Sequence, residues 1–406
     1  MIPQATAAYI HIPFCRRRCY YCDFPVSVVG DHSSDKINRE QAMKRYVAVL
    51  CQEISLSANW FPASGLETVF FGGGTPSLLP VDDLEKILAT LDQHFGIAKD
   101  AEISIEIDPG TFDLHQLKAY QHLGINRYSL GVQSFEDELL AQLGRTHRAD
   151  DIERAIAQLQ QVGIDHFSLD LISGLPNQTL EQWESTLEKA LSLSPRHLSC
   201  YDLIIEPGTA FERQAQTGTL LLPPDETSAQ MYRLSQQRLT TADYIHYEIS
   251  NYAQWGYQCR HNRTYWQNLP YYGFGMGAAS FLGGKRLTRP RTRQEYYSWV
   301  ETLRTLNNDL TLITDHDDPN DRLLETLMLG LRLQEGVNLD AIAIEFGSEV
   351  VTKLISVLQP YRNRNWVNWN QNDARHWGQL KLSDPEGFLF SNTILAHLFR
   401  TLTDEI

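Results

Sequence analysis

The feature that most constrains the fold of this chain is a repeated alternation of short apolar runs with amphipathic helical stretches. The first two thirds of the sequence contain six such pairs, whose strands are predicted at residues 7–12, 67–71, 102–107, 127–132, 166–172 and 197–204. Strands that alternate with helices favour a parallel sheet with helices outside it. Six pairs favour an incomplete barrel over a doubly wound open sheet, although periodicity alone leaves both open. In either arrangement, ligands bind at the carboxyl ends of the strands.

The last quarter of the chain has a different pattern. An acidic, turn-rich linker at residues 314–321 precedes three predicted helices, a short hairpin and a final helix, at residues 322–333, 338–346, 349–358, 380–390 and 392–402. Three helices and a hairpin predict a small winged-helix-like α+β module. We therefore expect two domains, residues 1–310 and residues 311–406.

The charge of the chain excludes some partners. The 406 residues carry a formal net charge of −15, and such a surface repels polyphosphate backbones, so we expect no binding to nucleic acid. No apolar run of about 18 residues predicts a transmembrane helix. The N-terminal residues lack the basic and apolar regions of a secretory signal. We therefore expect a cytoplasmic protein, with peripheral attachment to a membrane left open.

Three cysteines crowd into eight residues directly after the first predicted strand. Cys15, Cys19 and Cys22 have the spacing CxxxCxxC, and such crowding in a reducing compartment indicates metal binding. Three thiolates can hold three irons of a [4Fe-4S] cluster and leave the fourth iron open. A zinc site with His11 or Asp23 as the fourth ligand is the alternative, and the spacing leaves both open.

The cysteine loop and several further sequence words resemble the radical-SAM family. An aromatic residue, Tyr21, precedes the last cysteine, and the words YIHIPFC, FFGGGTPS, SIEIDPG, LGVQSF, DLISGLP and HNRTYW resemble its coproporphyrinogen-oxidase-like branch. The resemblance covers most of residues 9–285 and, more loosely, the C-terminal module. It implies an α/β fold with a partial (β/α)6 TIM-like barrel. It also implies a [4Fe-4S] cluster on the three cysteines and S-adenosylmethionine (SAM) on the open iron.

The resemblance further implies which residues contact SAM. The glycine-rich stretch would receive the amino group, Glu106 an ammonium or ribose hydroxyls, Arg145 the carboxylate and Asp170 the ribose. Taken alone, Glu106 and Asp170 would be strand-end caps and Arg145 a surface residue. The expected SAM contacts are Tyr9, Tyr21, Gly72, Gly73, Gly74, Thr75, Glu106, Gln133, Arg145, Asp170 and Ile204. No catalytic residue is assigned.

Two functional classes remain within this branch, an oxygen-independent coproporphyrinogen III oxidase and a heme chaperone. The cysteine motif of the oxidases resembles CxxxCxxCxC, but Phe24 occupies the position of the additional cysteine here. The oxidases also have a longer N-terminal arm, whereas only eight residues precede Tyr9. The word HNRTYW fits a motif of heme-binding members, whose candidate heme contacts here are His261, Asn262, Tyr265 and Trp266. We therefore favour the chaperone, with heme, an electron donor and heme-acceptor proteins, membrane-associated ones included, as partners. A different radical-SAM reaction is a third hypothesis.

Overall fold

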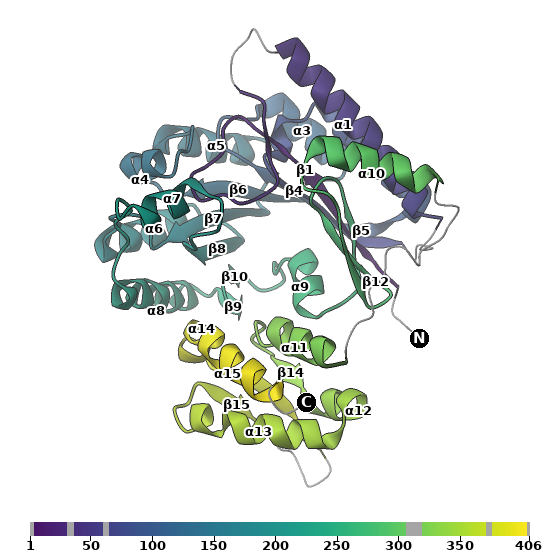
Figure 1. Ribbon diagram of the computed structural model, residues 1–406. Helices are drawn as coiled ribbons and strands as arrows, with labels where there is room; N and C mark the ends of the chain where they lie inside the picture. Colours follow the sequence, from purple (N-terminus) through teal and green to yellow (C-terminus); the bar gives the residue numbers. More distant parts are fainter. Residues whose placement is uncertain (1–3, 31–35, 60–64, 306–318, 371–375, 404–406) are drawn as a thin grey trace. The chain divides into compact units, whose positions relative to one another are not determined.

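The computed structural model describes residues 4–30, 36–59, 65–305, 319–370 and 376–403 (Figure 1). The chain forms two compact units. Unit 1 consists of Met1–Pro224 and Pro270–Asp315, and unit 2 of Asp225–Leu269 and His316–Ile406. The expected division between residues 310 and 311 lies outside the described residues and stays a prediction. None of the described helices is long and apolar enough to cross a membrane.

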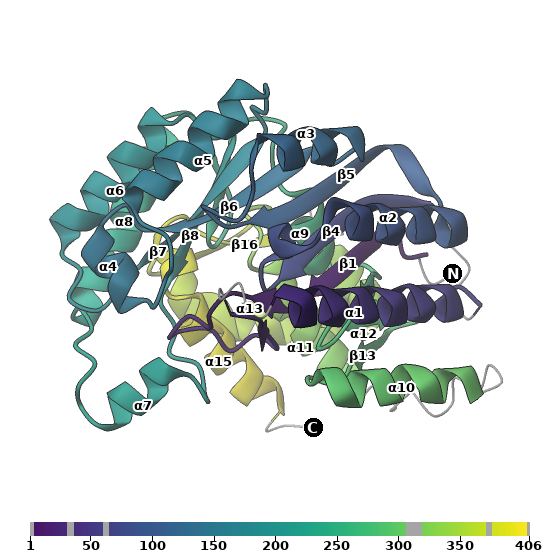
Figure 2. The same cartoon turned by 90° about the horizontal axis from the view of Figure 1, so that it is seen from above.

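Unit 1 is built on a parallel sheet (Figure 2). The strands that unit 1 contributes to this sheet lie in the order β11-β1-β4-β5-β6-β7-β8. Their bounds are Tyr272–Phe274, Ala7–Ile12, Leu66–Gly73, Ile97–Ile107, Arg127–Gln133, Phe167–Ser173 and His197–Asp202. From β1 to β8 the spatial order follows the chain order. A doubly wound sheet would instead reverse direction at a switch point. The predicted α/β fold with a partial barrel is therefore confirmed.

Helices follow the strands along the chain and bury one apolar face each. In α2, Val81–Phe95, the buried side chains are Leu84, Ile87, Leu88, Leu91 and Phe95. The other helices of unit 1 are α1, α3, α4, α5, α6, α7 and α10, at Lys36–Ser57, Leu114–His122, Asp137–Gln142, Ala149–Gln161, Leu180–Ser192, Ala210–Gln216 and Arg293–Thr305. A capping box begins α6: the Thr179 hydroxyl accepts a hydrogen bond from the Gln182 backbone amide at 3.2 Å. This bond pairs one of the first backbone N–H groups of the helix, which have no partner within the helix.

A buried ion pair joins the segment after residue 269 to the rest of unit 1. Glu53 of α1 accepts hydrogen bonds from Arg289 Nε at 2.8 Å, from the Tyr296 hydroxyl at 2.6 Å and from the Gly275 amide at 2.8 Å. A buried charge is tolerated when it is paired and its remaining hydrogen-bonding capacity is filled. These contacts tie β11 and α10 to α1.

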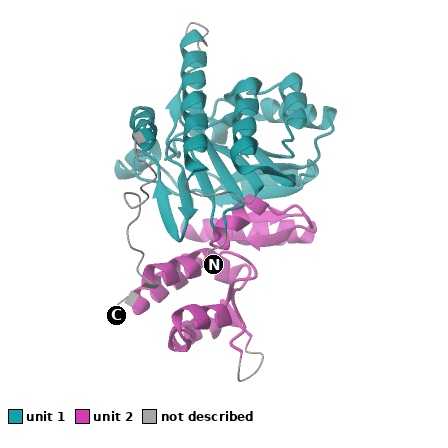
Figure 3. Ribbon diagram, turned by 90° about the vertical axis from the view of Figure 1, so that its right-hand side faces the viewer, with its two compact units in different colours: residues 1–224, 270–315 teal, residues 225–269, 316–406 magenta. Residues whose placement is uncertain are grey.

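Unit 2 contains two parts of the chain (Figure 3). The first holds α8, β9, β10 and α9, at Asp225–Thr241, Ile245–Glu248, Asn251–Ala253 and Arg260–Trp266. The second holds α11, α12, α13 and α15, at Pro319–Gly330, Leu339–Phe346, Ser348–Arg362 and Ser391–Thr403. Its antiparallel sheet has the order β14-β16-β15, formed by Val337–Asn338, Gln379–Leu382 and Val367–Trp369. Leucines and valines of these elements form one apolar core, which matches the predicted α+β module.

The predicted hairpin at residues 380–390 is wrong. Strand β16 ends at Leu382, and the chain then forms a short helix, α14, at Glu386–Leu389. The Ser383 hydroxyl accepts the Gly387 amide at 3.1 Å, which begins a helical turn where a returning strand was expected. The partners of β16 are β14 and β15 instead.

Candidate functional site

A cavity of about 460 Å³ lies at the carboxyl ends of the strands of unit 1. Side chains from the ends of β4, β5, β6 and β7 line it, together with the cysteine loop. This is where parallel α/β barrels bind ligands, because the loops that follow the strands meet there. All three cysteines of the CxxxCxxC motif line the cavity.

Nine of the eleven expected SAM contacts line the same cavity. They are Tyr21, Gly73, Gly74, Thr75, Glu106, Gln133, Arg145, Asp170 and Ile204. Tyr9 and Gly72 are not among its lining residues. They pack beside Glu106 instead, since an ideal Cβ at Gly72 would lie 3.0 Å from the Tyr9 ring and 3.1 Å from Glu106 Oε1.

The cysteine loop is closed at its base by backbone hydrogen bonds. The Ser27 amide donates to the Pro13 carbonyl at 2.6 Å, and the Val29 amide donates to the Cys15 carbonyl at 2.9 Å. These bonds belong to a short parallel pair, β2 at Phe14–Cys15 and β3 at Ser27–Val28. The two ends of the loop are therefore held together, which keeps its three thiols on one side of the cavity.

The thiols interact with each other and with nearby donors. Burial raises the pKa of Cys15 to about 12, and the charges of Asp108, Cys19 and Cys22 raise this pKa further. A hydrogen bond from the Thr75 hydroxyl acts in the opposite direction and lowers it. The Thr75 hydroxyl lies 3.8 Å from Cys15 Sγ, and Arg145 Nη1 lies 3.5 Å from Cys19 Sγ. Three clustered thiols with cationic and hydroxyl donors around them fit an iron–sulfur cluster, whose sulfurs accept such hydrogen bonds.

A single-ion zinc site fits less well. Within residues 4–30, 36–59, 65–305, 319–370 and 376–403, no group of three or more His, Cys, Asp or Glu side chains is arranged to hold one metal ion. Both ring nitrogens of His11 are engaged, with Nδ1 3.1 Å from the Tyr9 hydroxyl and Nε2 3.0 Å from the Pro25 carbonyl oxygen. Burial lowers the pKa of His11 to about 4. This neutral imidazole ties β1 to the end of the cysteine loop.

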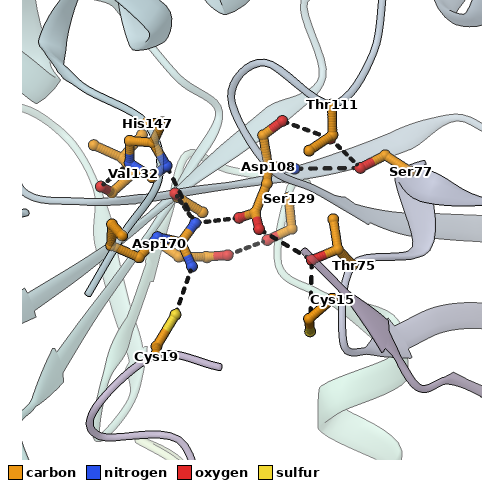
Figure 4. Close-up of polar contacts among 12 residues, drawn as sticks. Cys15, Cys19, Thr75, Ser77, Asp108, Thr111, Ser129, Val132, His147 and Asp170 are labelled. Carbon is orange, nitrogen blue, oxygen red and sulfur yellow. Dashed lines mark hydrogen bonds and ion pairs between the residues drawn. The ribbon is translucent and has the colours of Figure 1, made fainter. Parts of the chain in front are cut away.

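Two partly buried carboxyl groups line the cavity. The Gly73 amide donates to Glu106 Oε2 at 3.0 Å. Burial, with a further contribution from Asp170, raises the pKa of Glu106 to about 8. Burial also raises the pKa of Asp170, although the hydroxyls of Ser199 and Ser129 oppose this, with Ser129 Oγ 2.8 Å from Asp170 Oδ2 (Figure 4). Two neighbouring carboxyl groups with raised pKa values are suited to a ligand with positive charge and hydroxyl groups.

Asp108 is a site residue that sequence reasoning missed. It forms an ion pair with Arg145 and accepts the Thr75 hydroxyl at 3.1 Å (Figure 4). Its signal in the sequence is its position two residues after Glu106, at the end of β5. Arg145 Nε is buried and has no hydrogen-bond partner in the described part of the chain. The other guanidinium nitrogens contact Cys19 and Asp108, and the expected contact of Arg145 with a carboxylate stays a prediction.

The HNRTYW motif lies in unit 2, on α9. His261 is buried, its Nε2 lies 2.8 Å from the Tyr265 hydroxyl, and burial lowers its pKa to about 3. Cys259 caps the helix by accepting the Asn262 amide at 3.5 Å. The Trp266 ring lies 5.1 Å from the guanidinium carbon of Arg332. In this conformation the imidazole is therefore held inside unit 2 by a residue of its own motif.

Comparisons with known proteins agree with this geometry. The sequence model of the Radical SAM superfamily matches residues 9–190, and that of the HemN C-terminal domain matches residues 317–373. The heme chaperone HemW of Synechocystis sp. is 49% identical over 98% of both chains. The heme chaperone HemW of Bacillus subtilis is 33% identical over 94% of this chain and 98% of its own. The solved structure of coproporphyrinogen III oxidase (HemN) from Escherichia coli is 21% identical, with a TM-score of 0.79 over 98% of this chain and 91% of that one.

The barrel, the cysteine loop and the superfamily match define a radical-SAM protein. The likeness to the oxidase structure shows the shared fold. Within the superfamily, the identity to the relatives from Synechocystis and Bacillus over nearly the whole chain shows that the protein belongs to the HemW family.

Proposed function

We propose that this protein is a heme chaperone, which binds heme and passes it to acceptor proteins. The observation that carries the proposal is the 49% identity, over 98% of both chains, to a relative named heme chaperone HemW. Phe24 at the position of the additional oxidase cysteine supports the same choice. The proposal includes a cytoplasmic location, an electron donor for the cluster, and heme acceptors both at the membrane surface and in solution.

In this proposal the cavity of unit 1 holds a [4Fe-4S] cluster and SAM. Cys15, Cys19 and Cys22 would hold three irons, and the cluster when bound supplies the electron that cleaves a carbon–sulfur bond of SAM. Glu106 in its ionised form would accept hydrogen bonds from the amino group, and the guanidinium of Arg145 would face the carboxylate.

The heme contacts remain the proposed residues of unit 2. An imidazole is a common iron ligand, but His261 Nε2 lies 2.8 Å from the Tyr265 hydroxyl. Ligation through Nε2 would therefore require this hydrogen bond to break. Asn262, Tyr265 and Trp266 would then rearrange with α9 around the porphyrin.

The test is a heme titration of anaerobically reconstituted protein. We expect a shifted Soret band that saturates at one heme per chain, and weaker binding by His261→Ala. His122→Ala, at an exposed position in α3, is the control and should bind heme like the unchanged protein. Absence of saturable binding, or turnover of coproporphyrinogen III under reducing anaerobic conditions, would overturn the proposal in favour of another radical-SAM activity.

A further inference from the structure

The exposed face of α9 differs from its buried face. His261 is buried and lies against Tyr265, four residues later in the helix. Arg263 and Trp266 are three residues apart, so they share another face of α9. Both of these side chains are partly exposed. A large ligand therefore meets Arg263 and Trp266 before it meets His261.

Charged side chains from the turn after α11 lie at this face. Helix α11 packs against α9 (Figure 1). The guanidinium carbon of Arg332 lies 5.1 Å from the centre of the Trp266 ring. Glu335 forms an ion pair with Arg263, whose Nη1 also donates to Gln258 Oε1 at 2.9 Å. Two guanidinium groups and one carboxylate therefore accompany the aromatic ring at the exposed face of α9.

The turn that carries Arg332 and Glu335 is held on both sides. The Ile249 amide donates to the Arg332 carbonyl at 3.2 Å, and Gln379 Nε2 donates to the Glu335 carbonyl at 2.7 Å. Ile249 follows β9 and Gln379 begins β16, so two separate elements of unit 2 fix the turn. A site whose backbone is fixed before binding loses little conformational entropy when a ligand arrives.

The two arginines have different counter-charges. Burial raises the pKa of Glu248 in β9, and the charge of Arg332 opposes this rise. Glu248 is 1% exposed, so this counter-charge stays in the interior of unit 2. The counter-charge of Arg263 is Glu335, whose side chain is 45% exposed. An exposed ion pair contributes little to stability, so a carboxylate of a ligand can replace Glu335 at low cost.

We propose that Arg263 and Arg332 bind the two propionates of heme, and that Glu335 occupies Arg263 until the heme arrives. A flat apolar ring with two carboxylates at one edge matches an aromatic side chain accompanied by two guanidinium groups. This inference rests on the proposed chaperone function and adds residues that bind the cargo to those of the HNRTYW motif. Displacement of Glu335 also removes a contact that holds α9 in place, and ligation through His261 Nε2 requires α9 to rearrange.

The experiment compares heme with heme dimethyl ester, which keeps the ring and the iron but lacks both carboxylates. Reconstituted full-length protein is titrated with each, alongside the variants Arg263→Gln, Arg332→Lys and Glu335→Gln. The matched controls are Arg322→Gln and Glu345→Gln, which break another exposed ion pair of unit 2, with side chains 47% and 53% exposed. Thermal unfolding of every variant recognises damage to the fold.

We expect the unchanged protein to bind heme about ten-fold more tightly than the ester, because hydrogen bonds between charged groups are the strong ones. Arg263→Gln loses a guanidinium, and Arg332→Lys keeps its charge but loses the fork that binds a carboxylate through two N–H groups, so each should lower this preference to about three-fold or less. Glu335→Gln should bind heme about two- to five-fold more tightly and the ester as before, since only a propionate competes with Glu335. The controls should change neither ligand.

Equal affinity of the unchanged protein for heme and ester would overturn the arginine site, while heme binding that depends on His261 would still support the chaperone function. A preference for heme that survives in both arginine variants would overturn the site as well. If Glu335→Gln binds heme no more tightly than Glu345→Gln, the exchange of carboxylates at Arg263 is wrong. If the unchanged protein binds neither heme nor ester, the proposed chaperone function fails together with the site.

Discussion

Gly73 lies directly against the imidazole of His11. An ideal Cβ at Gly73 would fall 2.5 Å from His11 Cε1, and the φ angle of Gly73 is +113°. The amide of the same glycine donates to Glu106 at 3.0 Å. Glycine is therefore required at this position by the packing between β1 and β4 and by its positive φ.

Replacing Gly73 should destabilise unit 1 strongly. Gly73→Ala is expected to lower the free energy of unfolding by about 3 kcal/mol or more, because strained backbone and overpacking each contribute about 1–3 kcal/mol. Thermal unfolding of the cofactor-free protein measures the effect.

Gly163→Ala is the matched control for this substitution. Gly163 also has a positive φ, +74°, but nothing lies within 4 Å of an ideal Cβ there. Its replacement adds backbone strain of about 1–2 kcal/mol without a clash. Equal destabilisation by the two substitutions would show that the His11 side chain can move away from a new Cβ at little cost, and that packing does not require Gly73.

The metal content of two variants separates a cluster from a zinc site. Cys19→Ser is expected to abolish the visible charge-transfer absorption of reconstituted protein, since the proposed cluster would lose one of its three thiolate ligands. His11→Ala should keep the iron and sulfide stoichiometry, because both nitrogens of His11 bond to protein groups. Cys51→Ser, at a buried position on α1, should behave like the unchanged protein. Full iron in Cys19→Ser, or zinc that is lost on replacing His11, would contradict the cluster.

Much of the fold follows from local pattern. The strands of unit 1 could be predicted because buried parallel strands are continuous apolar runs and their helices have a separate period. The same pattern brought nine expected SAM contacts to one cavity, since residues that follow parallel strands meet at one edge of the sheet. Roles for these residues stay predictions.

Other features depend on contacts between distant parts of the chain and could not be predicted locally. Asp108 and Arg145 are 37 residues apart, and neither sequence neighbourhood indicates their ion pair. The burial of His261 is set by packing within unit 2, and its motif gives no sign of it. The chain forms α14 where a second hairpin strand was expected, and the Ser383 hydroxyl accepts a hydrogen bond from the Gly387 amide at this turn. Serine hydroxyls bond to nearby backbone groups in many loops, so this serine does not distinguish a helix from a hairpin.

Glu106 should make the stability of the cofactor-free protein depend on pH. Its pKa rises from an ordinary value of 4.5 to about 8 on folding, mainly because of burial. The folded protein therefore holds this proton more tightly, so the stabilisation is fully present below pH 4.5 and is lost as the pH rises to about 8. Glu106→Gln cannot ionise and can still accept the Gly73 amide through its carbonyl oxygen.

The measurement is the difference in melting temperature between the unchanged protein and Glu106→Gln from about pH 5 to pH 9. The unchanged protein should lose stability relative to the variant as the pH rises, and the difference should level off above about pH 8. Parallel curves over this range would contradict the raised pKa.

The ion pair between Asp108 and Arg145 should be important for stability because the guanidinium is buried. The side chain of Arg145 is 9% exposed and that of Asp108 is 25% exposed. Asp108→Asn removes the negative charge and leaves the buried cation without it, a change that typically costs about 3–5 kcal/mol and lowers the melting temperature by roughly 6–20 °C.

The exposed pair Lys189–Glu153, with side chains 43% and 57% exposed, is the matched control, and Glu153→Gln should cause no measurable change. Replacing both partners, as Asp108→Asn with Arg145→Met, should recover part of the loss, since no unpaired charge then remains buried. If Asp108→Asn melts like the control, water must reach Arg145 and the cavity is not a dry site.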